Sequence, residues 1–100
     1  MIVVAGTVTI RPGKREEAVR VAEAMARATR AESGCRHYRF YADLDDPQTF
    51  FVFEEWESEE ALARHFQTEH MKIFRQQLPD LVAGAPAIRR YVVSAAASMG

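Results

Sequence analysis

The most restrictive feature of the sequence is the run Phe50-Phe51-Val52-Phe53, in which four successive side chains are apolar. Turn residues bound this run, and its composition is typical of a strand. Successive side chains of a strand point to opposite faces, so both faces are apolar here. Residues 2–10 show the same two-sided pattern. An antiparallel sheet covered on one face alternates apolar and polar residues, so we expect both faces of this sheet to be covered.

The order of the predicted elements is β-α-β-β-α-β, the split βαβ or ferredoxin-like arrangement of the α+β class. Helical spacing predicts a first helix that ends near Arg30, before Ser33-Gly34. Ser58 is expected to cap the second helix. A further helical segment follows, and Pro79 is expected to bend or end it. The strands are predicted over residues 2–10, 35–42, 49–57 and 87–95.

These elements give a four-stranded antiparallel sheet with its helices on one face. One domain is expected over residues 1–95, followed by a frayed tail over residues 96–100. A chain of 100 residues has nothing left to cover the second face. We therefore expect a homodimer, in which sheets packed face to face form an α/β barrel and bury about 1,600 Å². The alternative is a monomer with an exposed apolar face.

Charge and composition exclude several classes of partner. Thirteen basic and fourteen acidic residues give a formal net charge of −1, which argues against binding to nucleic acid. No run approaches the roughly 18 apolar residues of a membrane span, and no signal peptide is evident. Cys35 is the only cysteine, so an internal disulfide is impossible. The expected location is the cytoplasm.

Cofactor motifs are also missing from the sequence. It has no Gly-x-Gly-x-x-Gly, no Walker loop and no serine nucleophile elbow. It shows no Cys/His cluster with zinc spacing, and His65 and His70 are five residues apart, off the i+4 register of a helix. No cofactor and no metal are expected, although a flavin in a dimer cavity stays open. Cys35 is expected to be a small buried apolar residue.

Two neighbouring carboxylates, Glu54 and Glu55, are candidates for proton transfer because they point to opposite faces of an apolar strand. Whichever of them lies on the deeper face would have a raised pKa, as a proton donor or acceptor requires. The alternative is an ion pair with one of four arginines: Arg36, Arg39, Arg89 or Arg90.

His65 lies on the helix face that should meet the sheet, three residues after Leu62 and four after Ala61. A histidine in such a position can act as a neutral base, or it can be a core residue bonded to a carboxylate or a carbonyl. The chain also carries many aromatic residues for a domain of this size. They either form the core alone or also line a cavity for a flat ligand, with Tyr38 or Tyr41 as a polar contact.

Four motifs then occur in order along the chain: Arg11-Pro12-Gly13, Glu32-Ser33-Gly34-Cys35-x-x-Tyr38, Glu54-Glu55-Trp56-Glu57-Ser58 and His65-x-Gln67-Thr68-x-His70-Met71-Lys72. Together they resemble the antibiotic biosynthesis monooxygenase family, and most of all its small bacterial quinol monooxygenases, over residues 2–92. The resemblance implies a dimeric α/β barrel with one pocket between sheet and helices in each protomer.

It also implies a reaction of a small aromatic substrate with O₂ that needs neither metal nor flavin. A phenol or hydroquinone loses a proton, its anion gives an electron to O₂, and the two radicals recombine to yield a quinone. On this resemblance His65 is the proposed proton-handling residue, Glu54 the second candidate, and Tyr38 orients a substrate oxygen. The expected pocket residues are Trp56, Phe40, Phe50, Val52, Phe66, Phe74 and Met71.

Differences between this chain and other branches of the family narrow the choice of function. Haem-degrading relatives use Asn, Trp and His where this chain has Gly6, His65 and Arg75, so haem degradation is not expected. Another branch isomerises a phosphorylated signalling sugar, and it shares a glutamate on the third strand and a histidine like His65. That function predicts arginines converging on a pocket, with Arg36 and Arg39 as candidates. A third possibility is a dimer that binds a ligand without turnover.

Overall fold

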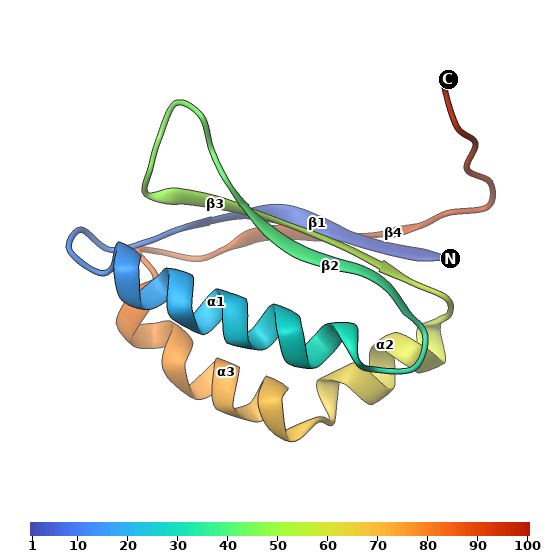
Figure 1. Cartoon of the computed structure of the whole chain (residues 1–100), viewed down its shortest axis with the longest axis horizontal. Coiled ribbons are helices and arrows are strands. Elements are labelled where there is room, and N and C mark those ends of the chain that lie inside the picture. The colour runs from blue at the N-terminus through green and yellow to red at the C-terminus, as the bar shows by residue number, and fades with distance from the viewer.

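The chain follows the predicted order of elements, with its second helical unit divided in two (Figure 1). The computed structural model describes all residues, 1–100. Its strands and helices, in chain order, are β1 (Ile2–Thr9), α1 (Arg15–Arg30), β2 (Cys35–Ala42), β3 (Thr49–Trp56), α2 (Glu59–Phe66), α3 (Glu69–Leu81) and β4 (Ala87–Val92).

The four strands form one antiparallel sheet in the order β2-β3-β1-β4. All three helices lie on one face of this sheet, as Figure 1 shows. The predicted fold class, a ferredoxin-like α+β protomer, is therefore confirmed. No helix has both the length and the apolar character that crossing a bilayer requires.

Side-chain caps explain why the second helical unit is divided. The Ser58 hydroxyl accepts a hydrogen bond from the Ala61 amide at 3.1 Å, which confirms the predicted start of α2. The Thr68 hydroxyl accepts one from the Met71 amide at 3.2 Å and so begins a separate helix, α3. Each cap satisfies an amide that the first turn leaves without a partner.

Three predicted boundaries differ from the observed ones. The last strand ends at Val92 rather than Ala95, because Val92 pairs with Ile2, where β1 begins. Beyond that point no strand is available as a partner. The first strand stops at Thr9, one residue early, and the third stops at Trp56, also one residue early. Pro79 does not end α3, which continues to Leu81.

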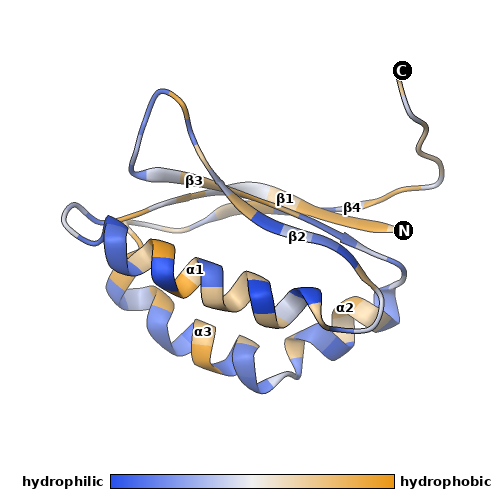
Figure 2. Ribbon diagram, viewed as in Figure 1, coloured by the Kyte–Doolittle hydropathy of each residue, from blue (hydrophilic) through white to orange (hydrophobic).

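The buried residues form two clusters between the sheet and the helices. The larger cluster contains Ile2, Met25, Ala26, Tyr38, Val52, Trp56, Ala61 and Leu62. The smaller cluster, near the opposite end of the sheet, contains Val8, Ile10, Ala18, Phe50 and Leu81. In Figure 2 the N-terminal half of β1, which contributes to the larger cluster, is among the most apolar segments of the fold.

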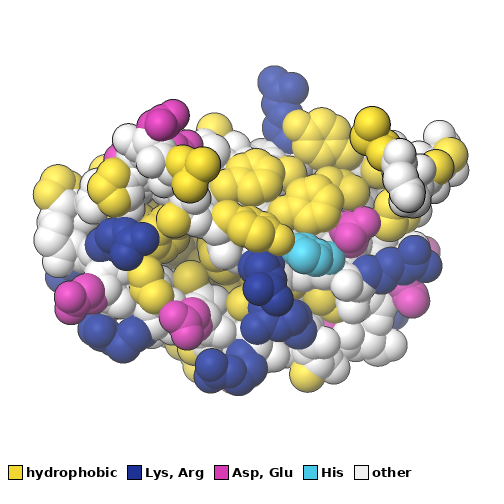
Figure 3. Space-filling model, turned by 45° about the horizontal axis from the view of Figure 1, so that its top comes forward, with side chains coloured by type: hydrophobic (Ala, Val, Ile, Leu, Met, Phe, Trp, Pro, Cys, Tyr) yellow, Lys and Arg dark blue, Asp and Glu magenta, His cyan; other side chains and the backbone are white.

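The other face of the sheet, called here the outer face, is covered by no element of the chain (Figure 1). Three of its aromatic side chains are exposed: Phe51 by 38%, Tyr41 by 43% and Tyr91 by 45%. Phe53 is half-buried between them. Figure 3 shows apolar side chains gathered on one face of the molecule. The two-sided strand pattern therefore has a structural counterpart, an apolar surface that the single chain leaves open.

Candidate functional site

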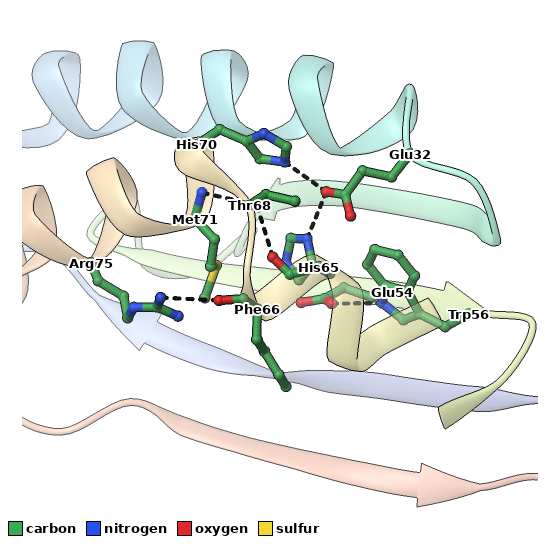
Figure 4. A network of polar contacts seen from close by, with 9 residues as sticks. All are labelled: Glu32, Glu54, Trp56, His65, Phe66, Thr68, His70, Met71 and Arg75. Carbon is green, nitrogen blue, oxygen red and sulfur yellow. Dashed lines mark hydrogen bonds and ion pairs between the residues drawn. The ribbon is translucent and has the colours of Figure 1, made fainter. Parts of the chain in front are cut away.

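The inner face of β3 carries a buried carboxylate, that of Glu54. Its side chain shares the helix-covered face with Trp56, and Trp56 Nε1 donates a hydrogen bond of 2.9 Å to Glu54 Oε1 (Figure 4). Only 8% of Glu54 is exposed. Glu55 points to the outer face, so Glu54 is the deeper of the two carboxylates.

None of the arginines considered as partners pairs with Glu54. Arg36 lies 4.0 Å from Glu57, and Arg90 donates to Glu59 at 3.0 Å. Burial raises the pKa of Glu54 to about 7, and the negative charge of Glu32 acts in the same direction, against the lowering effect of the Trp56 hydrogen bond. A carboxyl with a pKa in this range can both give and take a proton near neutral pH, as general acid–base chemistry requires.

His65 is buried at the end of α2, with 1% of its surface exposed. Its ring lies between two aromatic rings, with centroid distances of 4.8 Å to Trp56 and 5.7 Å to Tyr38. Burial lowers the pKa of His65, and the hydrogen bond and charge of Glu32 oppose that effect. The balance favours the neutral imidazole at pH 7.

The partner of His65 is Glu32, in the turn after α1. His65 Nδ1 lies 2.8 Å from Glu32 Oε2 (Figure 4). A carboxylate accepts hydrogen bonds, so this contact places the ring proton on Nδ1. The lone pair of the neutral ring is then on Nε2, the nitrogen that can receive a proton. A carboxylate that orients a histidine base in this way is a recurring catalytic arrangement.

A second histidine, His70, donates to the same Glu32 oxygen at 2.6 Å from its Nε2. Sequence reasoning missed this contact because the spacing rule assumes one continuous helix. The Thr68 cap interrupts the helix between His65 and His70 and turns the second ring back toward the first. Each of Glu32, His65 and His70 offers one atom that can ligate a metal ion, and these three atoms lie within 4.8 Å of one another. These are therefore the side chains that could hold a metal ion. In the structure the three are joined by hydrogen bonds.

Tyr38 is buried on the inner face of β2, opposite Glu54 across the β2–β3 pair. Burial raises its pKa, and the charge of Glu54 raises it further, so the hydroxyl stays neutral. Arg30 Nη1 donates to the Tyr38 carbonyl oxygen at 2.8 Å and ties α1 to this strand. Cys35, expected to be buried, is only partly buried and packs against the larger core cluster. Partial burial raises the pKa of its thiol to about 11.

The expected pocket residues fall into two groups. Trp56 and Val52 belong to the larger core cluster, and Phe40, Met71 and Phe74 pack against it. Phe50 belongs to the smaller cluster, and Phe66 is 37% exposed. One pocket lined by all seven therefore stays a prediction.

A cleft of about 270 Å³ lies beside this centre, between α1 and β2. Two expected pocket residues, Phe40 and Phe50, line it, and so does Arg39. Phe40 separates the cleft from the histidine centre, because its ring packs on Tyr38 at 5.7 Å. Arg36, the other arginine considered for a pocket, does not line this cleft.

Gly6 lies where β1 and β4 approach closely. A side chain at this position would overlap the carbonyl oxygen of Ala87. The asparagine that haem-degrading relatives place here has no room in this chain, in agreement with the sequence comparison above.

Comparisons with known proteins show which family and fold the chain resembles. The family model described as antibiotic biosynthesis monooxygenase matches residues 1–77. The protein sll1783 of Synechocystis is 37% identical over 93 residues, which is 93% of this chain and 63% of that protein. "Putative monooxygenase YcnE" of Bacillus subtilis is 32% identical over 74% of this chain and 78% of its own length.

Solved structures show the same fold. Rv0793 of Mycobacterium tuberculosis superposes with a TM-score of 0.89 at 30% identity, covering 97% of this chain and 98% of that one. A protein from Deinococcus radiodurans, described as a putative antibiotic biosynthesis monooxygenase, gives a TM-score of 0.92 at 25% identity and covers 100% of this chain and 99% of that one.

Proposed function

Because this chain belongs to the antibiotic biosynthesis monooxygenase family, we propose that it is a cofactor-independent monooxygenase that oxidises quinol-like or polyphenolic aromatics with O₂. The observation that carries the proposal is the Glu32–His65 pair. It leaves a neutral imidazole with its lone pair on Nε2, next to the rings of Tyr38 and Trp56 and with 1% of its surface exposed.

In the proposed reaction His65 Nε2 takes the hydroxyl proton of the bound ring. The resulting anion gives one electron to O₂, and superoxide recombines with the ring radical at a carbon. The peroxide that forms takes up the proton held by His65. The O–O bond then breaks as the same ring carbon gives up its hydrogen as a proton, and hydroxide leaves with that proton as water, so a new carbonyl oxygen stays on the ring. One O₂ thus supplies one oxygen to the product and one to water. The protein's contribution is to orient the ring, exclude water and favour the anion.

Glu54 and Tyr38 have supporting roles in this proposal. A carboxyl with a pKa of about 7 can return the proton to the departing water when His65 has already released its own. The Tyr38 ring lies 5.7 Å from the His65 ring between centroids, and its neutral hydroxyl can donate a hydrogen bond to a substrate oxygen. The aromatic ring would enter past Met71 and the exposed Phe66, where α2 meets α3.

The proposed working form is a homodimer joined through the outer faces of two sheets. The support is the row of exposed aromatic side chains there, which a monomer rarely leaves open to water. Packing two such faces buries an area typical of a stable interface, about 1,600 Å². The histidine centre lies on the opposite face and would not be covered.

One observation favours a second function, isomerisation of a phosphorylated substrate. Arg39 lines the cleft between α1 and β2 together with three further arginines. Such a site suits a phosphate group. The cleft is separated from His65 by Phe40 and Tyr38, so the oxygenase remains the better-supported function.

The proposal is tested by oxygen uptake. Metal-stripped protein is mixed with a panel of hydroquinones and naphthalene diols, and the rate is compared with autoxidation and with the His65→Asn variant. The Asn amide can still donate toward Glu32 but provides no base at the Nε2 position. Uptake above background that is lost in His65→Asn is the expected result. Uptake abolished by stripping the metal, or unchanged in His65→Asn, would exclude the proposed mechanism.

A further inference from the structure

The cleft between α1 and β2 has a composition that the proposed reaction does not explain. β2 is an edge strand of the sheet, so the cleft opens to solvent along its free side. In Figure 3 a hollow is visible on the side where α1 faces β2, with apolar side chains at its floor and charged ones at its rim. The residues that line it are Arg15, Val19, Ala22, Glu23, Ala26, Arg27, Arg30, Arg39, Phe40, Tyr41, Ala42 and Phe50.

The charge of the cleft is strongly one-sided. Four arginines and one glutamate line it, in a chain whose formal net charge is −1. The structure contains five ion pairs within 4.0 Å, and none of them involves a cleft arginine. Positive charge therefore gathers around this hollow without an ion pair to an acidic residue of the chain.

Two of the guanidinium groups are held in place. Arg15 Nε donates to the Pro47 carbonyl at 2.8 Å, and its guanidinium lies 5.6 Å from the centre of the Phe50 ring. Arg30 is held by its bond to the Tyr38 carbonyl. Arg27 and Arg39 make no such bond, so their donors are available to a ligand. Arg39 pairs with Phe53 and so starts from the outer-face side of the edge strand β2, and it lines the cleft at its rim. A guanidinium binds a planar oxyanion through two parallel hydrogen bonds.

The floor of the cleft is apolar and open because α1 presents small side chains there. Ala22 and Ala26 leave a gap opposite the rings of Phe40 and Phe50. Aromatic walls of this kind favour a flat ligand. The volume of about 270 Å³ is slightly below the usual range for small-molecule sites, which suits a ligand of one or two rings.

We propose that this cleft is a binding site for a small aromatic anion, whose ring packs between α1 and the rings of Phe40 and Phe50 and whose oxyanion bonds to Arg27 and Arg39. Binding of an anion in this cleft does not depend on the proposed oxygenase reaction. Binding here would occur whether or not the protein consumes O₂.

The test is a calorimetric titration of the full chain with 2-naphthoate, its neutral analogue 2-naphthamide, and inorganic phosphate. The Arg27→Gln/Arg39→Gln variant removes two charges from the cleft. The matched control Arg20→Gln/Arg64→Gln removes two charges from exposed arginines outside it. Thermal unfolding of both variants verifies that they fold.

We expect 2-naphthoate to bind to the wild type and the control. Its binding to the cleft variant, which lacks both charge-assisted contacts, should be about 10-fold or more weaker. Amide NMR signals of Ala22 and Ala26 should shift during the titration. Three results with the wild type would overturn the proposal: no binding of 2-naphthoate, equal binding of 2-naphthamide, or equal binding of inorganic phosphate. Equal weakening in the control variant would also overturn it, because charge alone would then explain the binding.

Discussion

His65 Nδ1 lies 2.8 Å from Glu32 Oε2, and this contact joins the end of α2 to the turn after α1 across 33 residues of sequence. It fixes the tautomer of the buried ring. Loss of a general base lowers the reaction rate by about 10²- to 10⁴-fold. Glu32→Gln should lower the rate by less than that, because the His65 base is still present. The hydrogen bond and charge of Glu32 raise the pKa of His65, so the acid limb of kcat/KM should move to lower pH in this variant.

The matched control is Glu57→Gln, which changes an exposed carboxylate by the same atoms. It should leave both the rate and the acid limb unchanged. An unshifted acid limb in Glu32→Gln would mean that Glu32 serves the fold and does not act on His65.

The raised pKa of Glu54 should make the free energy of unfolding depend on pH. The folded chain holds a proton on Glu54 up to a pKa of about 7, and the unfolded chain releases it near 4.5. This group's contribution to stability is thus fully present below pH 4.5 and is lost as pH rises through 7. The loss approaches about 3 kcal/mol.

Glu54→Gln cannot ionise, and its amide oxygen can still accept from Trp56. Its free energy of unfolding should therefore rise relative to wild type between pH 5 and pH 8, as urea titrations at several pH values would show. Glu55→Gln, on the outer face, should follow the wild type. A constant difference between Glu54→Gln and wild type across this range would disprove the raised pKa.

Thr68 should hold the His70 ring in position as well as cap α3. Its hydroxyl accepts from Met71 and donates to the His65 carbonyl at 2.8 Å, at the turn between the two histidines. Thr68→Ala should destabilise the protein by about 1 kcal/mol and should shift the ring NMR signals of His70. Ser58→Ala should cost a similar amount and leave those signals in place. Identical spectra for the two variants would contradict this role.

The outer face predicts the oligomeric state. Wild type should be a dimer by light scattering, and Phe51→Glu should be a monomer because it places a charge in the apolar contact. Leu44→Glu also replaces an apolar side chain with a charged one, but at a fully exposed loop residue, and this variant should stay a dimer. A monomeric wild type, or a dimeric Phe51→Glu, would show that the outer face is not the interface.

The order of elements was predictable because each depends on local signals. Ser58 marks the start of α2 by its own chemistry, and two-sided strands indicate a sheet that needs a second cover. The strand ends were less predictable because they depend on pairing, as Val92 and Ile2 show.

Parts of the candidate site were predictable in the same way. Alternation placed Glu54 with Trp56, but only the positions of the helices decide which face is buried. The Glu32–His70 contact spans 38 residues and depends on the cap at Thr68, so no local pattern indicated it.

The most direct test of the central claim, that His65 takes the substrate proton, is an anaerobic titration of the protein with 1,4-naphthohydroquinone. Without O₂ only binding and ionisation occur, and the absorbance spectrum reports the anion. The anion should form at neutral pH in the wild type and in the His37→Gln control, and the hydroquinone should stay neutral with His65→Asn. A hydroquinone that stays neutral in the wild type, or ionises equally with His65→Asn, would contradict the claim.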